Sequence, residues 1–432
     1  MAANPDRAAC LASPELKVHP GIHSAVVNRT ARMPRPLAAL FLAEVVSTTG
    51  SEIAAVALPW FVLVTTGSPV RMSVVMAAEF AGMTLFGIPS GRAASSLGPR
   101  RTMLASDLIR APLVALIPAL HWAGVLSFPV IAAVGLAIGA FFPAYQSSQL
   151  LVLTGLVGED EVRLTRVGGL LGSVNETASF IGPAAGGLLV ALLGPTATLM
   201  IDAGSYLVAF VLVASFVPRT ATPAGEEGRR GALEGLRFLR RDRFLLGTVV
   251  GVAVFEIGWT ALMATLPVVA RRRFHGTARL AGWFLASYGA GSVTGGLISS
   301  RARSAGDRTA RFAVVAMAAA TWPLLAPVPA WGVVLSVAAV GVCTGLFFPR
   351  FFAALTLRTP RHLRARVMAS ATTVMSATGP LGFVGAGVLL QGSTSALPGF
   401  ALVAAATTVG AAIIVISRLA GTRTPPVPME RG

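Results

Sequence analysis

A twelve-residue phrase occurs twice in this chain, 206 positions apart. Residues 132–143 read AAVGLAIGAFFP, and residues 338–349 read AAVGVCTGLFFP. Small apolar matches carry little weight in a chain that is 54% hydrophobic, so the informative part is Phe-Phe-Pro at the same offset from two matched glycines. The chain therefore contains a duplication, which predicts two halves of one architecture rather than an array of short repeats.

A shift of 208 positions superposes two further segments. It aligns Gly50, Leu58 and Pro59 with Gly258, Leu266 and Pro267, and it aligns Phe80, Thr84, Gly87, Gly98 and Arg100 with Tyr288, Ser292, Gly295, Gly306 and Arg308. Because three separate segments agree to within two positions, we expect the two halves to share one fold.

Long apolar stretches place the chain in a membrane. Only 12% of its residues are charged, against about 25% in soluble domains. We predict an all-α integral membrane protein with twelve transmembrane helices in two six-helix, pseudo-symmetric bundles. The stretches long enough to cross a hydrocarbon core of about 30 Å are residues 37–64, 72–92, 102–121, 129–156, 167–193, 197–217, 244–270, 280–300, 312–328, 332–357, 367–391 and 397–417.

The formal charge of +17 is explained by topology, without nucleic acid as a partner. With the N-terminus inside, the inward loops carry the arginines, as the positive-inside rule requires. The outward loops near 121–128, 194–196, 329–331 and 392–396 carry no Lys or Arg. Both termini are therefore predicted to be cytoplasmic. One outward loop departs from the rule, because it contains Arg271, Arg272, Arg273 and Arg279. These arginines form either a solvated rim or a patch that binds anionic lipid or substrate.

The polar segments divide the chain into parts. We expect a disordered cytoplasmic tail at 1–34, six-helix bundles at 35–217 and 244–418, a cytoplasmic linker at 218–243 and a second tail at 419–432. Within the linker, 231–241 is either plain connection or an amphipathic helix on the inner leaflet, with Leu233, Leu236 and Leu239 inward. The cationic residues are Arg save for Lys17, which is typical of a high-GC genome and favours a bacterial inner membrane.

The loop between the second and third predicted helices contains Gly91, Ser95, Ser96, Gly98, Arg100 and Arg101. With twelve helices in two halves, this frame resembles the major facilitator superfamily, whose loop reads Gly-x-x-x-Asp-Arg-x-Gly-Arg-Arg and whose halves are parallel repeats. In that family the Asp latches one half to the other. Ser95 and Ser96 replace the Asp and Arg here, so the resemblance implies an altered latch.

The fifth predicted helix contains Gly182-Pro183-Ala184-Ala185-Gly186-Gly187. This phrase resembles the Gly-Pro-x-x-Gly-Gly motif of exporter branches of the family. Proline bends a helix and the glycines let a neighbouring backbone approach closely. Phrases at 47–50, 107–110 and 202–208 look like those of macrolide and siderophore efflux pumps. The resemblance covers about residues 36–418 and implies export, without naming the substrate.

Several acids lie inside predicted helices, where a charge costs about 2.5–3.5 kcal/mol. Asp107 and Arg110 are three residues apart and share one helix face, so we predict that they pair. The pair is either a structural contact that replaces part of the latch or a group with a role in coupling. Asp202 lies near the outer end of its helix, where we expect it to reach water or cap a neighbouring helix. We read both acids as structural.

Other acids are candidates for proton coupling. Glu256 lies near the middle of the seventh helix, and in the resembled family helices one, four, seven and ten line the cavity. The resemblance therefore places Glu256, Glu52 and Glu44 near substrate. Desolvated carboxyl groups hold protons near neutral pH, as a reversible proton carrier requires. We rank Glu256 first, then Glu52, then Glu44 and Glu79; Glu79 and Glu176 also suit hydrogen bonds between helices.

Aromatic and polar side chains on the same helices predict a surface for an amphipathic molecule, or simply helix packing. Arg350 follows the second Phe-Phe-Pro, where the first half has Ala144. It is either a counter-ion for an acid or an anionic substrate, or a side chain that snorkels to the inner surface. The other candidates are Trp60, Phe141, Phe142, Tyr145, Gln146, Gln149, Trp259, Phe347, Phe348 and Phe351.

These features predict a transporter rather than an enzyme. The sequence lacks the phosphate-binding Gly-x-x-x-x-Gly-Lys-Ser/Thr loop, and five His with two Cys suggest neither a metal cluster nor a cofactor. We expect a monomer that exports a small amphipathic compound by proton antiport and alternating access, with small molecule, protons and lipid bilayer as its partners. A nutrient importer of the same fold and a transport-inactive membrane sensor are the alternatives.

Overall fold

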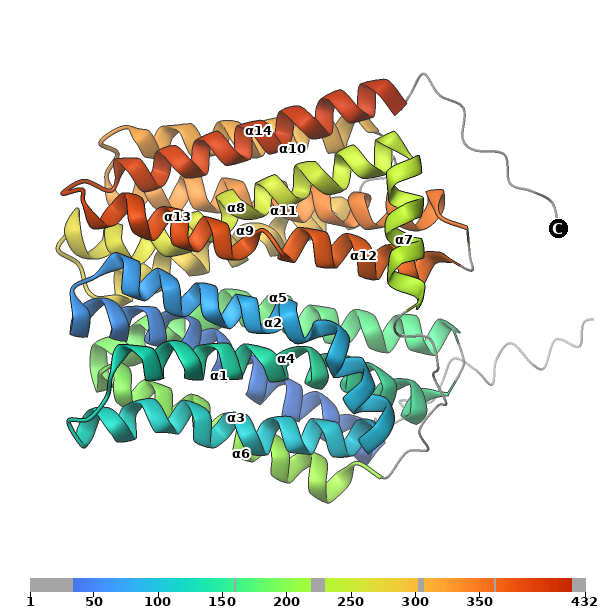
Figure 1. Ribbon diagram of the computed structural model, residues 1–432, viewed down its shortest axis with the longest axis horizontal. Helices are drawn as coiled ribbons and strands as arrows, with labels where there is room; N and C mark the ends of the chain where they lie inside the picture. The colour runs from blue at the N-terminus through green and yellow to red at the C-terminus, as the bar shows by residue number, and fades with distance from the viewer. Residues whose placement is uncertain (1–33, 159–160, 219–229, 302–306, 361–362, 422–432) are drawn as a thin grey trace, which may run out of the picture. The chain divides into compact units, whose positions relative to one another are not determined.

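The computed structural model describes residues 34–158, 161–218, 230–301, 307–360 and 363–421. The expected tails therefore lie outside the described residues, apart from a few positions beside the helices. Every regular element in the described part is a helix (Figure 1). The first half contains α1 (Arg35–Thr66), α2 (Pro69–Leu97), α3 (Pro99–Trp122), α4 (Phe128–Val157), α5 (Glu161–Leu193) and α6 (Pro195–Phe216).

A short helix, α7 (Arg230–Arg241), precedes the second half. That half contains α8 (Arg243–Arg272), α9 (Ala278–Arg301), α10 (Asp307–Thr321) with the 3₁₀ helix η1 (Trp322–Leu325), α11 (Ala330–Arg358), α12 (Arg364–Ser376), α13 (Gly379–Gln391) and α14 (Leu397–Gly421).

The twelve predicted spans correspond to these helices, and the all-α, twelve-helix fold is confirmed. α10 with η1 makes the ninth span, and α12 with α13 makes the eleventh. Ten of the spans in the described residues are long and apolar enough to cross a membrane by length and composition alone. The other two are α9 and α10 with η1. α9 is rich in Gly and Ser, and it packs between α5 and α11.

The eleventh span is broken between α12 and α13. Pro380 occupies the first turn of α13, where its missing N–H and fixed φ suit a helix start and interrupt the helix before it. Thr378, at the break, donates its hydroxyl to the Ala253 carbonyl at 2.6 Å. A side chain at the interruption thus ties the span to α8.

The duplication is visible in the helix packing. α2 packs on α4 and α3 on α6, as α9 packs on α11 and α10 on α14. Both copies of the repeated phrase supply glycines to these contacts: Gly139 lies against the backbone carbonyl of Glu79, and Gly345 lies against that of Ser292. A Cβ at either position would overlap the neighbouring backbone. The glycines of the repeat therefore allow close approach of the two helices in each half.

α7 runs across the direction of the other helices (Figure 1). Its Gly235 lies against the backbone of α12 at Arg366, its Leu239 is buried, and its Glu234 forms an ion pair with Arg366. Of the two alternatives for 231–241, the helix forms, as α7. Its buried face packs on the protein, so the expectation that Leu239 points into the inner leaflet is wrong; the Leu233 side chain lies outside the described residues.

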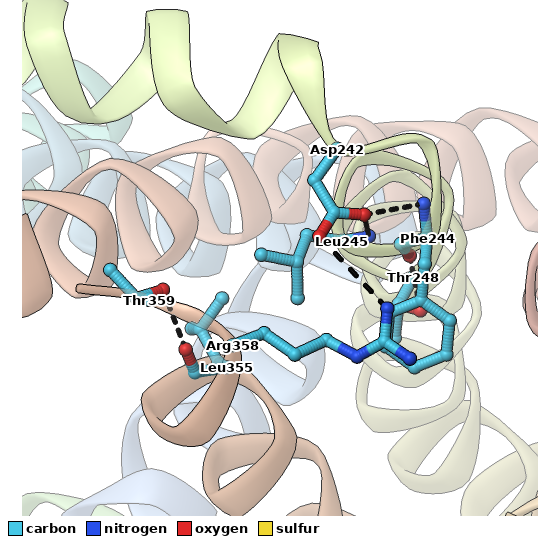
Figure 2. A network of polar contacts seen from close by, with 7 residues as sticks. All are labelled: Asp242, Phe244, Leu245, Thr248, Leu355, Arg358 and Thr359. Atoms are coloured by element: carbon cyan, nitrogen blue, oxygen red, sulfur yellow. Dashed lines mark hydrogen bonds and ion pairs between the residues drawn. The ribbon is translucent and has the colours of Figure 1, made fainter. Parts of the chain in front are cut away.

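The junction between α7 and α8 is fixed by Asp242 (Figure 2). One carboxylate oxygen accepts the backbone N–H groups of Phe244 at 2.9 Å and Leu245 at 3.1 Å, which caps the start of α8. The other lies 4.0 Å from the Arg358 guanidinium. That guanidinium stacks 3.8 Å from the centre of the Phe244 ring. The end of α11 is thereby attached to the start of α8.

The two ends of the helical assembly differ in their connections. At one end, the short-turn end, lie the turns 66–69, 122–128, 193–195, 272–278, 325–330 and 391–397. At the other, the termini end, lie α7, the start of α1 and the end of α14. These names are used below in place of inside and outside.

Candidate central cavity

A cavity of about 340 Å³ lies between the two halves. Its walls differ in chemistry. The four charged side chains, Glu52, Glu79, Arg110 and Asp202, all come from the first half, which also contributes apolar, thioether and aromatic groups. The second half contributes only aromatic, thioether and apolar groups, among them Trp259, Met263, Tyr288 and Phe383. The rings of Trp259 and Tyr288 lie 3.8 Å apart between centroids. The arrangement suits a molecule with a polar or charged end and an apolar body.

Two of the four proton-coupling candidates line this cavity. Glu52 accepts a hydrogen bond from the Ser179 hydroxyl at 3.1 Å, and Glu79 lies on α2. Glu44 is buried outside the lining, where Gln149 donates its amide and Thr48 its hydroxyl to the carboxylate. Glu256 is half-buried on α8, one turn from the lining residue Trp259.

Glu176, which sequence reasoning placed with Glu79 between helices, does make such a bond. Its carboxylate accepts the Ser292 hydroxyl at 3.2 Å, which joins α5 to α9 across the two halves. Glu79 instead belongs to the cavity wall.

Arg110 is held by Tyr206 of α6. It donates to the Tyr206 hydroxyl, and its guanidinium lies 4.1 Å from the centre of the same ring. The Tyr206 hydroxyl is also 2.8 Å from that of Ser51 on α1. Arg110 makes no hydrogen bond to Asp107, so the predicted direct pair does not form and the two side chains interact only through their charges. Neither carboxylate oxygen of Asp107 has a hydrogen-bond partner, although the residue is 0% exposed.

Asp202 also differs from expectation. It lies seven residues inside α6, and its side chain lines the cavity rather than the rim of the bundle. Ser205, one turn later, donates its hydroxyl to the Asp202 carboxylate at 3.4 Å. Because α6 begins at Pro195, the helical rise of about 1.5 Å per residue carries Asp202 roughly 10 Å from the helix end.

Of the aromatic and polar candidates, Phe142 and Trp259 line the cavity. Four of the others are buried in hydrophobic cores, and Phe348 packs against the same core as Phe347: Trp60, Tyr145, Phe347 and Phe351. Gln149 binds Glu44, Phe141 is half-buried and Gln146 is exposed. Most of these candidates therefore serve helix packing, which was the alternative to substrate contact.

The cavity includes aromatic residues that sequence reasoning did not select as substrate candidates. Tyr288 and Tyr206 both line it, as does Phe383. The sequence repeat could have indicated Tyr288, since it aligns this residue with the lining residue Phe80. No sequence feature distinguishes Tyr206 and Phe383 from ordinary packing residues.

Arg350 is not a counter-ion in this structure. It is buried, and its guanidinium donates to the Ser299 hydroxyl at 2.7 Å and to the Leu346 carbonyl at 2.6 Å. It therefore joins α11 to α9 within the second half. Snorkelling to an exposed surface is likewise excluded by its burial.

Within the loop motif between α2 and α3, Arg100 joins α3 to α6. Arg100 donates to the carbonyls of Val217 and Ala214, each at 2.6 Å, so it caps the end of α6 in its own half. Gly98 has a φ of 84°, which favours glycine at the turn. The side chains of Ser95 and the residues just before it lie outside the described part of the chain.

The Gly-Pro-x-x-Gly-Gly phrase of α5 lies where three helices meet. Gly182 packs on Glu52 and Gly186 on Ile53, both of α1, while Gly187 packs on Gly282 of α9. Pro183 lines the cavity, and its carbonyl also faces Gly282. The close approach predicted from the glycines is present, and it joins the two halves.

The halves are joined at the level of the cavity and toward the short-turn end. α5 packs on α9, and α2 packs on α13 through Phe80 and Ser73. Nearer the short-turn end, Arg271 of α8 donates to the carbonyl of Leu63 on α1. Toward the termini end, Thr84 of α2 bonds the Ser376 carbonyl at 3.4 Å.

The outward arginines of the sequence analysis have a structural role at the short-turn end. Besides Arg271, Arg272 donates to the carbonyls of Leu390 and Ser393 at 2.7 and 2.8 Å, and Arg273 donates to that of Val328. These carbonyls lie at helix ends and turns, where they lack partners within a helix. The solvated-rim and anion-patch interpretations therefore fit Arg279 alone, which is exposed.

The sequence profile of the Major Facilitator Superfamily matches residues 40–382. The chain belongs to this superfamily. The multidrug efflux pump Tap of Mycobacterium tuberculosis is 26% identical over 372 residues, which cover 82% of this chain and 87% of the pump. Tap of Mycolicibacterium fortuitum is 27% identical over 367 residues, with coverages of 82% and 89%.

Solved structures agree in fold. A bacterial homologue of the iron transporter ferroportin, in an inward-facing state, superposes with a TM-score of 0.71 at 12% identity and covers 89% of this chain and 98% of its own. The D-xylose–proton symporter gives a TM-score of 0.68 at 11% identity, with coverages of 90% and 98%. At these identities the similarity shows the fold alone, which is that of a multi-pass membrane transporter.

Proposed function

We propose that this transporter exports small amphipathic organic compounds in exchange for protons. The observation that carries the proposal is the central cavity, in which the charged side chains all come from the first half while both halves supply aromatic and apolar groups. Its volume of about 340 Å³ lies in the range of small-molecule sites. The similarity to mycobacterial multidrug efflux pumps supports export.

The apolar part of the lining, to which both halves contribute, suits substrates of varied shape. Met76, Met83 and Met263 line the cavity together with several aromatic rings. Methionine is unbranched and polarizable, so it adapts to ligands of different outline, and methionine-rich surfaces are typical of promiscuous binding. We therefore propose a range of compounds with a common polarity rather than one metabolite.

The acids of the cavity supply the coupling to protons. An ionised carboxylate inside a membrane costs about 2.5–3.5 kcal/mol even on insertion scales. Glu52 and Glu79 therefore need a positive counter-charge when the cavity is shielded from water. Binding of a cationic substrate beside them displaces a proton from the acids of the first half, and this exchange of one positive charge for another is sufficient for antiport. Glu256, off the lining, is the weaker candidate.

The direction of transport follows from orientation. We assign the termini end to the cytoplasm, because the arginine-rich connections and both termini lie there. The inter-half contacts described above lie at the cavity and toward the short-turn end, apart from the Thr84–Ser376 bond toward the termini end. We infer that the cavity opens toward the cytoplasm in this conformation and that rocking of the two halves exposes it on the other side.

Transport into inverted membrane vesicles tests this function. With ethidium as the probe and a proton gradient imposed, vesicles containing the protein should accumulate ethidium, and an uncoupler should abolish accumulation. Glu52→Gln and Glu79→Gln should each lower gradient-driven accumulation at least about tenfold, a loss of about 1.4 kcal/mol in transition-state stabilisation. Glu234→Gln, on the surface helix α7, is the matched control and should transport normally.

Two results would overturn the proposal. Accumulation that persists after the gradient collapses would exclude proton antiport. Gradient-driven uptake of ethidium by intact cells, with no accumulation in inverted vesicles, would favour the importer.

A further inference from the structure

One arginine in the first half is surrounded by four carboxyl groups. Arg110 interacts electrostatically with Asp107, Asp202 and Glu79, and also with Glu44. The group is referred to below as the Arg110 cluster. α4 adds Tyr145 to it and α6 adds Tyr206; neither carries a charge at neutral pH. α1, α2, α3, α4 and α6 thus all face this cluster.

The charges of the Arg110 cluster do not balance when every acid is ionised. One guanidinium and four carboxylates sum to −3, since 1 − 4 = −3. An unpaired charge in a protein interior costs several kcal/mol. The cluster therefore holds protons whenever no other cation is bound near it, and the number of protons changes when a cation arrives.

The four acids form two layers. Glu79 and Asp202 line the central cavity together with Arg110, so a bound molecule reaches them directly. Glu44 and Asp107 lie outside the lining, and both are buried. Arg110 interacts with both layers. A change of charge in the cavity therefore alters the electrostatic environment of Glu44 and Asp107, because it changes the position of the Arg110 guanidinium.

Of the two buried acids outside the lining, Asp107 is the one whose charge has less support. Glu44 accepts hydrogen bonds from Gln149 and Thr48, which stabilise its ionised form. Asp107 is 0% exposed, and neither of its carboxylate oxygens has a hydrogen-bond partner. A buried carboxyl group without donors is stable as the neutral acid. In this conformation Asp107 therefore carries a proton.

Arg110 is placed to change this state. Its guanidinium donates to Tyr206, and its buried Nε atom has no partner. Asp107 lies three residues earlier on the same face of α3. A change of the Arg110 rotamer, with the backbone unmoved, brings the guanidinium to the Asp107 carboxyl group and stabilises its ionised form.

We propose that Asp107 is the proton-carrying residue of this transporter and that Arg110 is the positioning residue that couples it to a cationic substrate. When a lipophilic cation binds beside Glu79 and Asp202, the cation replaces Arg110 as their counter-charge. The guanidinium turns to Asp107, whose O–H bond breaks, and the proton passes to water at the termini end. One positive charge enters the cluster and one leaves.

This inference rests on the proposed function, and it narrows the substrate class to lipophilic cations. Its test measures proton release during binding, without a membrane gradient. Purified protein in weakly buffered detergent is mixed with tetraphenylphosphonium, while a pH-sensitive dye reports protons and calorimetry reports binding. The wild-type protein should release about one proton per bound cation, with a stoichiometry that falls as the pH rises above the titration range of the cluster.

The variants separate Asp107 from the cavity acids. Asp107→Asn should bind tetraphenylphosphonium within about threefold of the wild-type affinity and release no proton, and Asp107→Glu should restore release. Glu176→Gln is the matched control in a membrane-spanning helix and should release protons as the wild type does. Retained affinity in Asp107→Asn shows that this variant is folded. Tyr206→Phe, which frees Arg110, should shift the pH profile of release.

Three outcomes would overturn the inference: unchanged proton release in Asp107→Asn, binding of tetraphenylphosphonium without proton release by the wild type, or equal release on binding of the neutral analogue triphenylphosphine oxide. The vesicle assay is independent of these. Gradient-driven ethidium transport together with any of them would leave the proposed function standing, and proton release in detergent without vesicle transport would reject the exporter alone.

Discussion

The hydroxyl of Ser68 lies 2.8 Å from Oε1 of Gln391, so the turn between α1 and α2 is tied to the end of α13 in the other half. The same amide oxygen accepts the backbone N–H of Val70 at 3.4 Å. Arg271 supplies a second tie, to the Leu63 carbonyl. A few polar bonds thus hold the short-turn end closed above the cavity, and they must break for the halves to rock.

Gln391→Ala should weaken this closure. Loss of one net hydrogen bond, worth about 0.5–1.5 kcal/mol, shifts the equilibrium between closed and open forms by roughly two- to twelvefold. Distance distributions between spin labels at Gly67 and Gly392 should show a larger population of long distances. Gln391→Glu keeps the acceptor oxygen and should behave as the wild type. An unchanged distribution in Gln391→Ala would show that packing of α2 on α13 suffices.

Gly139→Ala should destabilise the first half. A Cβ at this position meets the Glu79 carbonyl of α2, so the two helices must separate, at a cost of about 1–3 kcal/mol. The apparent melting temperature in detergent should fall. Gly204→Ala, in α6, is the control, because no atom lies within 4 Å of its Cβ position. It should be neutral or stabilising, by up to about 1 kcal/mol. Equal stabilities would contradict the close helix contact.

Asp242→Ala should loosen the start of α8. The change removes the acceptor for two backbone N–H groups and the partner of Arg358 (Figure 2). Loss of such a cap costs about 0.5–2 kcal/mol, and hydrogen exchange of the first turn of α8 should accelerate. Asp242→Asn separates the two contributions, since Asn caps as well as Asp but carries no charge. If Asn exchanges as fast as Ala, the ion pair rather than the cap is responsible.

Trp259→Ala should weaken binding of an aromatic cation. Trp259 lines the cavity and packs on Tyr288, and removal of an aromatic contact of about 1.5 kcal/mol raises the dissociation constant roughly tenfold. Tetraphenylphosphonium binding in detergent measures this. Trp331→Ala is the control, because Trp331 is 67% exposed on α11 and lies off the cavity lining. Equal affinities of the two variants would place the ligand elsewhere.

The sequence predicted much of the fold because its signals are local or repeated. Helix lengths follow from apolar stretches, and two equivalent halves follow from a phrase written twice. The contact glycines Gly139 and Gly345 were already marked in that phrase. Even the exporter resemblance rested on short runs such as the one from Gly182 to Gly187, which the structure places at the junction of α1, α5 and α9.

The site was predicted less well, because its members meet through rotation and tilt of whole helices. Glu44 and Glu52 share α1, yet Glu52 lines the cavity and Glu44 does not. The spacing on α3 correctly predicted that Asp107 and Arg110 share one helix face. It did not reveal that the Arg110 guanidinium donates to the Tyr206 hydroxyl.

By itself, the sequence determined that this chain is a duplicated, twelve-helix membrane protein with acids buried at a cost that demands partners or protons. Only the tertiary structure decided which acid faces the cavity and which acceptor Arg110 binds. A helical sequence fixes the relative angles of its own side chains, whereas the direction in which each face points is set by packing against helices that lie far away along the chain.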